Sequence, residues 1–401
     1  MWIEIHTIDE LDRLCSDPTL AIIFDIIYEG IRLRDMMTWN PYLSHSRCQT
    51  GSKYSLDNGK LISADRCRVA MTEIDYHIVK DQYDYDRCAI LRCMVCKKKP
   101  LPKWFLDTMR EWYTDKVQLK YPDHDETPVE KEIRLRRLRE SKSSLNAIYG
   151  MCATAWARDK YSYDFEAQDW ALPECKTDLA GISDEIDKIR KPSSKTFLPY
   201  AWGIYTTAYA RQRLFRAAEC CHALYCDTDS VKGIDWDMDK LEVFNAELRA
   251  KSDAAGFTIK DAKGVDRHIG VFEQDVSYVR FSALHAKCYA GEVINSKSGE
   301  IELHATIAGV TDTNGYPLDD PRRITKEDEL GSLEELEDGK IFTACGGTRA
   351  IYKSEIHDII IDGERIHSYG GCAILNTTYE IGGTNDLVAM YLLSDPYVRY
   401  K

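Results

Sequence analysis

The spacing of hydrophobic residues changes along the chain and predicts alternating strands and helices. The stretches 21–35 and 88–100 are rich in β-branched and apolar residues, which is typical of strands. Helical spacing predicts helices over 70–84, 102–120 and 200–222, and a strongly basic helix is expected over 130–150. Asn58-Gly59 predicts a hairpin turn. Residues 155–200 are polar and mixed and predict an insertion, whereas the chain beyond residue 300 is rich in strand and turn residues.

Composition narrows the class of protein without deciding its function. The 401 residues are 44% hydrophobic and 30% charged, which is an ordinary globular balance. The net charge of -13 argues against a general affinity for nucleic acid, so any such site must be a local basic surface. The cysteines are scattered, and we find no signal peptide and no membrane-spanning run, so we expect a cytoplasmic protein with reduced thiols.

Two aspartates at the end of an apolar strand form the first candidate site. Asp227 and Asp229 follow Ala223–Cys226, where a carboxylate is costly unless a cation balances it. Strand alternation would aim both side chains the same way, and close carboxylates suit Mg²⁺ with phosphate oxygens completing its coordination shell. The alternative is a simple turn in which Asp and Thr cap backbone amides.

The basic helix carries a face of mixed chemistry. Lys142, Asn146 and Tyr149 lie four and seven positions apart and therefore share one side, with Lys131 at nearly the same angle. This face offers a cation for phosphate, an amide and an aromatic ring. The alternative is a solvated basic helix with Tyr149 in the core.

A third pattern lies further along the chain. Lys287-Cys288-Tyr289 would put a lysine and a tyrosine on one side of a strand, where both could hold a nucleic-acid backbone. Such a triplet is also common on ordinary surface strands.

In their order along the chain, which is basic helix, aspartate pair and Lys287–Tyr289, the three stretches resemble the motifs of family B DNA polymerases, in particular of the protein-primed branch. Residues 142–150, KSSLNAIYG, are similar to the fingers motif K-x-x-x-N-S-x-Y-G, with Ala147 in place of serine. Residues 225–230, YCDTDS, match the palm motif Y-x-D-T-D-S, and residues 287–289 match K-x-Y. The stretches YTTAYAR at 205–211 and IAGVTD at 307–312 also look like this branch, so the resemblance covers roughly residues 20–320.

The resemblance implies an α+β right-hand fold with an antiparallel palm sheet, helical fingers and a small β-rich thumb. It implies template-directed DNA synthesis with Mg²⁺ or Mn²⁺ bound by Asp229 and Asp227, and with Lys142 as a further catalytic group. Incoming dNTP would contact Lys142, Asn146, Tyr149 and Gly150. The expected DNA or primer contacts are Lys287, Tyr289, Tyr225, Thr228, Arg139 and Lys131.

The resemblance also implies an order of domains. Residues 1–110 would hold the palm remainder and a first insertion, followed by fingers at 111–154 and a second insertion at 155–198. The palm would continue over 199–310, and the thumb and a C-terminal extension would occupy 311–401. We expect the acidic run 326–340 to be a solvated face.

Two parts of the family pattern are not found. The first palm motif, D-x-x-S-L-Y-P, supplies the other metal-binding aspartate, and the exonuclease domain precedes it. Asp25, in FDIIYEG, resembles the strand downstream of that motif, and Leu138 stands where some members carry a second lysine. The chain therefore looks like a C-terminal polymerase part that needs an N-terminal polymerase fragment, besides primer-template DNA, dNTP and a possible terminal protein.

Other functions remain open at this stage. A non-catalytic DNA-binding remnant or accessory subunit would keep the same surfaces, and a stand-alone metal-dependent phosphotransferase would use Asp227 and Asp229 alone. Cys93 and Cys96 form a lone C-x-x-C without a second pair, so we expect core packing there and no zinc.

Overall fold

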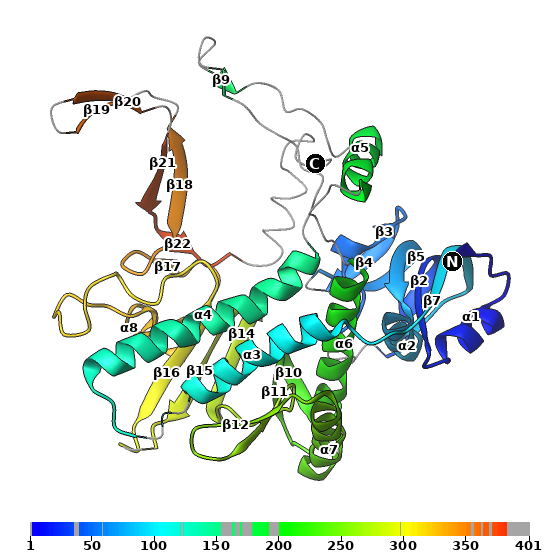
Figure 1. The fold of residues 1–401 in the computed structure, drawn as a ribbon, viewed down its shortest axis with the longest axis horizontal. Coiled ribbons are helices and arrows are strands. Elements are labelled where there is room, and N and C mark those ends of the chain that lie inside the picture. Colours follow the sequence, from blue (N-terminus) through cyan, green and yellow to red (C-terminus); the bar gives the residue numbers. More distant parts are fainter. Residues whose placement is uncertain are drawn as a thin grey trace. The chain divides into compact units, whose positions relative to one another are not determined.

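The structure is a computed structural model of the chain (Figure 1). It forms two compact units, residues 1–155 with 195–273 (unit 1) and residues 156–194 with 274–401 (unit 2). The described residues are 2–35, 40–57, 59–120, 122, 124–153, 163–164, 169–170, 179–191, 200–296, 298–353, 357–361, 364–368 and 371–382.

Unit 1 contains an antiparallel sheet in the order β1-β7-β2-β5-β3, with β4 paired to β5 and β6 paired to β2. In its long central strand, β2, alternate residues point to the same face, and Ile22, Phe24, Ile26 and Tyr28 are buried there. A short 3-10 helix, η1, covers His45–Arg47. The strands are β1 (Trp2–Ile3), β2 (Leu20–Leu33), β3 (Gln49–Thr50), β4 (Tyr54–Asp57), β5 (Lys60–Thr72), β6 (Tyr83–Asp84) and β7 (Arg87–Lys97).

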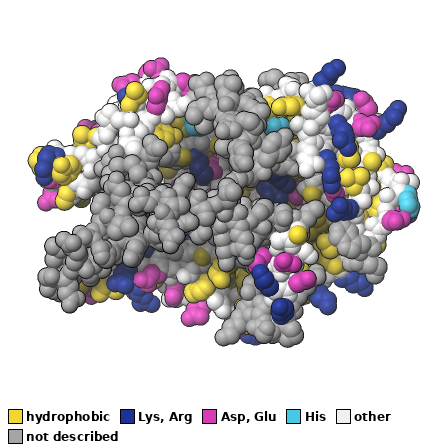
Figure 2. Space-filling model, turned by 90° about the horizontal axis from the view of Figure 1, so that it is seen from above, with side chains coloured by type: hydrophobic (Ala, Val, Ile, Leu, Met, Phe, Trp, Pro, Cys, Tyr) yellow, Lys and Arg dark blue, Asp and Glu magenta, His cyan; other side chains and the backbone are white. Residues whose placement is uncertain are grey.

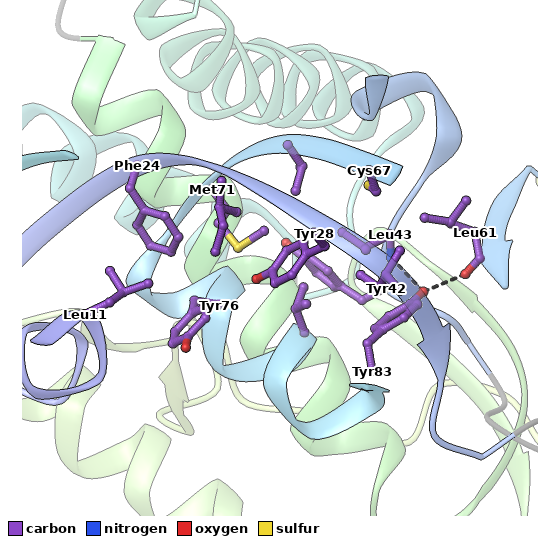
Figure 3. Packing of buried hydrophobic residues seen from close by; sticks show 14 of the residues in the cluster. Leu11, Phe24, Tyr28, Tyr42, Leu43, Leu61, Cys67, Met71, Tyr76 and Tyr83 are labelled. Atoms are coloured by element: carbon purple, nitrogen blue, oxygen red, sulfur yellow. Dashed lines mark hydrogen bonds between the residues drawn. The ribbon is translucent and has the colours of Figure 1, made fainter. Parts of the chain in front are cut away.

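Helices α1 (Ile8–Cys15) and α2 (Glu73–Gln82) complete the core of this sheet. Figure 3 shows Leu11 of α1 and Tyr76 of α2 packed around Phe24. The Tyr83 hydroxyl links two further segments of this core. It donates to the Leu61 carbonyl at 2.8 Å and accepts from the Leu43 amide at 3.3 Å (Figure 3).

Among the described residues of unit 1, four longer helices and two hairpins accompany this sheet. Thr127 and Glu130 form a capping box with Pro128 at the first turn, which explains where the basic helix begins. The elements are α3 (Lys103–Lys120), α4 (Pro128–Cys152), α6 (Tyr200–Ala218), α7 (Met238–Ala255), β10 (His222–Asp227), β11 (Ser230–Ile234), β12 (Thr258–Lys260) and β13 (Asp266–His268).

Unit 2 is built around the antiparallel sheet β14-β15-β16. Leu330, Leu333 and Leu336 pack into its core, so the acidic run is not simply the solvated face that we expected. Glu329 in the same run accepts the backbone amides of Ala344 and Cys345. The elements are β8 (Tyr163–Asp164), β9 (Asp169–Trp170), α5 (Leu179–Arg190), β14 (Tyr278–His285), β15 (Cys288–Ile294), β16 (Ile301–Ile307), α8 (Lys326–Leu330), η2 (Leu333–Glu335), β17 (Ile341–Phe342), β18 (Thr348–Lys353), β19 (His357–Ile361), β20 (Glu364–Ser368), β21 (Gly371–Asn376) and β22 (Tyr379–Glu380).

Most elements agree with the sequence patterns, and all described strand pairs are antiparallel, which fits the expected α+β class. Two helix bounds differ from the expected ones by three residues or more. The helix expected over 70–84 begins only at Glu73, because β5 continues to Thr72 and the Thr72 side chain then caps α2. The helix expected over 200–222 ends at Ala218, and His222 already belongs to β10.

Two further features of the described residues limit the interpretation. None of the helices within them is long and apolar enough to span a bilayer. Lys and Arg side chains are interspersed with Asp and Glu side chains over the coloured part of the face in Figure 2, so a basic surface must be sought element by element.

Candidate functional site

The two candidate metal-binding aspartates flank a tight turn. Asp227 ends β10 and pairs with Ser230 at the start of β11, which leaves Thr228 and Asp229 as the turn residues. Thr228 has a φ of 53°, in the left-handed region that non-glycine residues rarely adopt. Strand alternation therefore does not apply to Asp227 and Asp229, because Asp229 lies outside the strand.

The oxygen atoms at this turn fit part of a divalent-cation site. The Thr228 hydroxyl donates to Asp227 Oδ1 at 2.9 Å. Asp229 is exposed, and its carboxylate has no hydrogen bond or ion pair to another described residue. Hard carboxylate oxygens suit Mg²⁺, which commonly takes one or two protein carboxylates and fills its shell with water and phosphate oxygens. Within the described ranges, however, no group of three or more His, Cys, Asp or Glu residues converges on one point.

Close packing holds the hairpin in shape. A Cβ added to Gly233 of β11 would lie 2.4 Å from Cys221 Sγ and 2.9 Å from the His222 carbonyl oxygen. Trp236 Nε1 donates to the Gly233 carbonyl at 3.0 Å. The register slips between Ala223 and Tyr225, so β10 is bulged just before the aspartates. Bulges of this kind redirect the side chains that follow them.

Cations border the hairpin from a distant part of the chain. Burial raises the pKa of the Cys226 thiol to about 12, and the positive charges of Lys232 and Lys60 oppose this rise. Burial lowers the pKa of Lys60 itself, and the neighbouring charges of Arg47 and Arg211 lower it further. Sequence reasoning missed Lys60, because it starts β5 and only the fold brings it near β10.

The basic face of α4 is exposed, as expected for a binding surface. Lys142 and Asn146 are exposed, and their side chains have no hydrogen bond or ion pair to another residue in the described part of the chain. Tyr149 is 40% exposed, so the alternative that placed it in the core was wrong. Lys131, Arg139 and Gly150 are also exposed.

A neighbouring side of α4 is buried. Leu138 and Ser141 are buried, and Leu145 packs against a cluster formed with Tyr113 and Val117 of α3. Helical geometry places this buried stripe about 40–100° around the axis from Lys142. Lys142 itself lies outside this stripe and is exposed.

Helix α6 connects the two candidate surfaces within unit 1. It contacts α4 on one side and both strands of the β10–β11 hairpin elsewhere along its length. Gly203 permits the first contact, because a Cβ there would lie 3.3 Å from Ala153 Cβ and 3.4 Å from Cys152. The aspartate turn and the exposed face of α4 therefore belong to one packed assembly.

An ion pair fixes α6 to the sheet. Arg211 Nη2 donates to Asp75 Oδ1 at 2.7 Å, and Arg211 Nε donates to the Tyr42 hydroxyl at 2.9 Å. Tyr42 also donates to Asp75, and the Thr72 amide reaches the other carboxylate oxygen at 3.1 Å. Burial alone would raise the pKa of Asp75, but the charge of Arg211 and these hydrogen bonds outweigh it and lower the pKa. Sequence reasoning quoted the stretch with Arg211 but missed this partner, which is distant in the sequence.

Asp25 does not behave as a spare metal ligand. Its two carboxylate oxygens each accept a hydrogen bond from Arg68 Nε at 3.1 Å, and Arg68 Nη2 also contacts the carboxylate. The Asp25 side chain is 16% exposed. A carboxylate held in this way by a guanidinium is a poor candidate for the missing palm aspartate.

The K-x-Y residues lie in unit 2 and differ from the expected strand pattern. Lys287 has a φ of 58° and forms the tip between β14 and β15, so it does not share a strand face with Tyr289. Tyr289 is the second residue of β15, and its ring lies 5.6 Å from the ring of Phe281.

Comparisons with known proteins place the fold. No family model matches the chain, and no curated protein matches its sequence. Solved structures of Phi29 DNA polymerase do match its fold. The complex with primer-template DNA has a TM-score of 0.51 and 17% identity over 91% of this chain and 52% of that chain. The complex with primer-template DNA and incoming nucleotide substrates has a TM-score of 0.51 and 15% identity, over 90% and 51% of the two chains. The chain thus has a polymerase-like fold and spans about half the length of these structures.

Proposed function

We propose that this chain binds dNTP and primer-template DNA and takes part in template-directed nucleotidyl transfer, as the C-terminal part of a protein-primed family B DNA polymerase. One observation carries the proposal: α6 packs against both the helix that presents Lys142, Asn146 and Tyr149 and the hairpin that presents Asp227 and Asp229. The polymerase-like fold, and the order of the motifs along the chain, support it.

Each exposed group on α4 has a distinct part in binding dNTP. The Lys142 ammonium, which has no partner within the described residues, binds the triphosphate as a point charge. The amide of Asn146 positions nucleotide or template, and the exposed ring of Tyr149 stacks at the nascent base pair. Gly150 leaves the space beside it open, since nothing lies within 4 Å of the Cβ that it lacks.

The turn with Asp227 and Asp229 binds the divalent cation that accompanies the dNTP. Asp229 and Asp227 hold the divalent cation, and Thr228 keeps one oxygen of Asp227 in place. A bound Mg²⁺ would activate the attacking hydroxyl of the primer or terminal protein and neutralise the leaving group. In unit 2, Lys287 and Tyr289 hold the primer end. Asp227 and Asp229 supply only part of the cation site, and a further carboxylate is required. Asp25 does not supply it, because its carboxylate is held by Arg68.

The proposal predicts an enzyme that is incomplete alone. Loss of one charge-stabilising group costs about 3–4 kcal/mol of transition-state stabilisation, so we expect no substantial DNA synthesis by this chain by itself. The partner is an N-terminal polymerase fragment that carries the other palm aspartate and the exonuclease.

Primer extension with Mg²⁺ or Mn²⁺, with and without that fragment, tests the proposal. We expect extension only with the fragment, and its loss in Asp229→Asn and Lys142→Ala. Arg136→Gln is the matched control, because Arg136 lies on α4 about 120° from Lys142 and pairs with Glu140 at 3.2 Å. Robust synthesis by the chain alone would refute the split-enzyme hypothesis. DNA binding without synthesis under any condition, unchanged in Asp229→Asn, would favour a non-catalytic DNA-binding subunit.

A further inference from the structure

A cavity of about 340 Å³ lies between α6 and α7, on residues that the proposed site does not use. Tyr209 and Arg213 of α6 line it together with Phe244 and Lys251 of α7. Its size is at the lower end of the range for small-molecule sites, so it can hold a nucleotide unit rather than a large ligand.

Arg213 is the unusual residue of this cavity. It is half-buried, yet the described residues give it no ion pair and no hydrogen bond. Burial lowers the pKa of its guanidinium, which nevertheless stays charged at neutral pH. Burying a charge without a partner costs free energy. An anion that enters the cavity would offset that cost.

The neighbouring arginines of α6 show the contrast. Arg211 is paired with Asp75, and Arg216 is paired with Glu247 at 2.9 Å while it stacks over the Phe244 ring at 4.2 Å. Arg211 and Arg213 point to different sides of the helix, because two positions correspond to about 200° of rotation. The fold supplies carboxylates for two of the three arginines and leaves Arg213 for a ligand.

Backbone geometry makes room for Arg213. Gly270 has a φ of 81°, and a Cβ at this position would lie 2.7 Å from Arg213 Nη1. A side chain at 270 would therefore displace the guanidinium. Glycine at 270 therefore permits both the positive φ and the space that the guanidinium occupies.

The other cavity residues suggest which anion is bound. Lys251 is exposed and has no ion pair within the described part of the chain. Tyr209 is 39% exposed, with Lys98 Nζ 6.0 Å from its ring centroid. Cations beside an accessible aromatic ring are the combination that binds a phosphate and stacks the attached base. A peptide carboxylate would leave the ring unused.

We propose that this cavity binds a nucleotide unit, with its phosphate at Arg213 and Lys251 and its base against Tyr209. The nucleotide is either free or part of a single DNA strand. The proposal rests on the proposed function only in that DNA and nucleotides are the expected ligands. Its residues are separate from Lys142 and Asp229, so the two proposals can fail independently.

Binding is measured in EDTA, which removes any contribution of a metal at Asp229. The probes are inorganic phosphate, dAMP and a fluorescent oligo(dT) of about 12 nucleotides, a length within the usual site size. We compare wild type with Arg213→Met, Lys251→Gln and the control Arg136→Gln. We expect at least about a tenfold loss of affinity in Arg213→Met, a smaller loss in Lys251→Gln and none in the control. Without ligand, the Arg213→Met variant should melt at a higher temperature than wild type, because it no longer buries an unpaired charge.

The probes also distinguish the source of the nucleotide. Tight dAMP binding with weak oligo(dT) binding identifies a free nucleotide, and salt-sensitive oligo(dT) binding identifies a strand. Unchanged binding in Arg213→Met, a lower melting temperature of that variant, or equal binding of phosphate and dAMP would overturn the proposal. A parallel Mg²⁺-dependent dNTP titration of Lys142→Ala reports on the other site, so failure of one proposal is not mistaken for failure of both.

Discussion

Arg211 of α6 and Asp75 of α2 form an ion pair with an N–O distance of 2.7 Å, and this pair joins the two helices. The Asp75 side chain is 2% exposed and that of Arg211 is 29% exposed. Because α6 also contacts the aspartate hairpin and α4, this pair sets the position of the helix on which the candidate site depends.

We predict that Asp75→Asn lowers the free energy of unfolding by about 3 kcal/mol, because it leaves the Arg211 charge buried without its partner. Chemical denaturation measures the change. Asp81→Asn, at an exposed carboxylate of the same helix, is the control and should change stability little. A loss below about 1 kcal/mol for Asp75→Asn would show that α6 is held mainly by apolar contacts.

The same pair predicts a dependence of stability on pH. The pKa of Asp75 is lower in the folded protein than in the unfolded chain, so its contribution is complete above the unfolded pKa of about 3.9. The contribution is lost as pH falls through the folded pKa. We therefore expect the unfolding free energy of wild type to fall below about pH 4 more steeply than that of Asp75→Asn. Parallel curves for the two proteins would contradict this account.

Gly233→Ala should distort the hairpin that carries the aspartates. The new Cβ would meet the His222 carbonyl oxygen at 2.9 Å, and backbone cannot move aside as a flexible side chain can. We expect a loss of about 1–3 kcal/mol in the free energy of unfolding, together with loss of metal-dependent nucleotide binding. Calorimetry and a dNTP titration measure the two effects. Gly150→Ala is a contrasting variant, because a Cβ at Gly150 would meet nothing within 4 Å.

Gly150→Ala tests whether a ligand explains the glycine. The residue lies in the last turn of α4 with nothing within 4 Å of the missing Cβ, so alanine should raise the free energy of unfolding by up to about 1 kcal/mol. We also expect weaker dNTP binding, because the added methyl occupies space that the nucleotide uses. A more stable variant with unchanged dNTP affinity would remove Gly150 from the site.

The sequence predicts the helices and strands of unit 1 well, because hydrophobic spacing directly reflects burial. The long helix with Lys142 is an example: its buried stripe and its exposed face both follow from the 3.6-residue period. Spacing could not show that Thr228 and Lys287 adopt positive φ values, which depend on how the hairpins close. It therefore placed Asp229 and Lys287 within strands, whereas both lie in turns.

Residues brought together from distant parts of the chain were also beyond prediction. Lys60 near Cys226, Asp75 beside Arg211 and Arg68 beside Asp25 carry no local signal. The expectation for the acidic run was wrong because its leucines, Leu330, Leu333 and Leu336, pack into the core although most of the residues around them are charged.

The central claim is that Lys142 and Asp229 act on the same Mg²⁺-bound dNTP. A double-mutant cycle on dNTP affinity, with Lys142→Ala, Asp229→Asn and the double variant, tests it most directly. With Mg²⁺ we expect a coupling free energy of about 1 kcal/mol or more, and in EDTA we expect the Asp229→Asn effect to vanish while the Lys142→Ala effect remains. Additive effects with Mg²⁺, or an Asp229→Asn effect that does not require metal, would contradict the account.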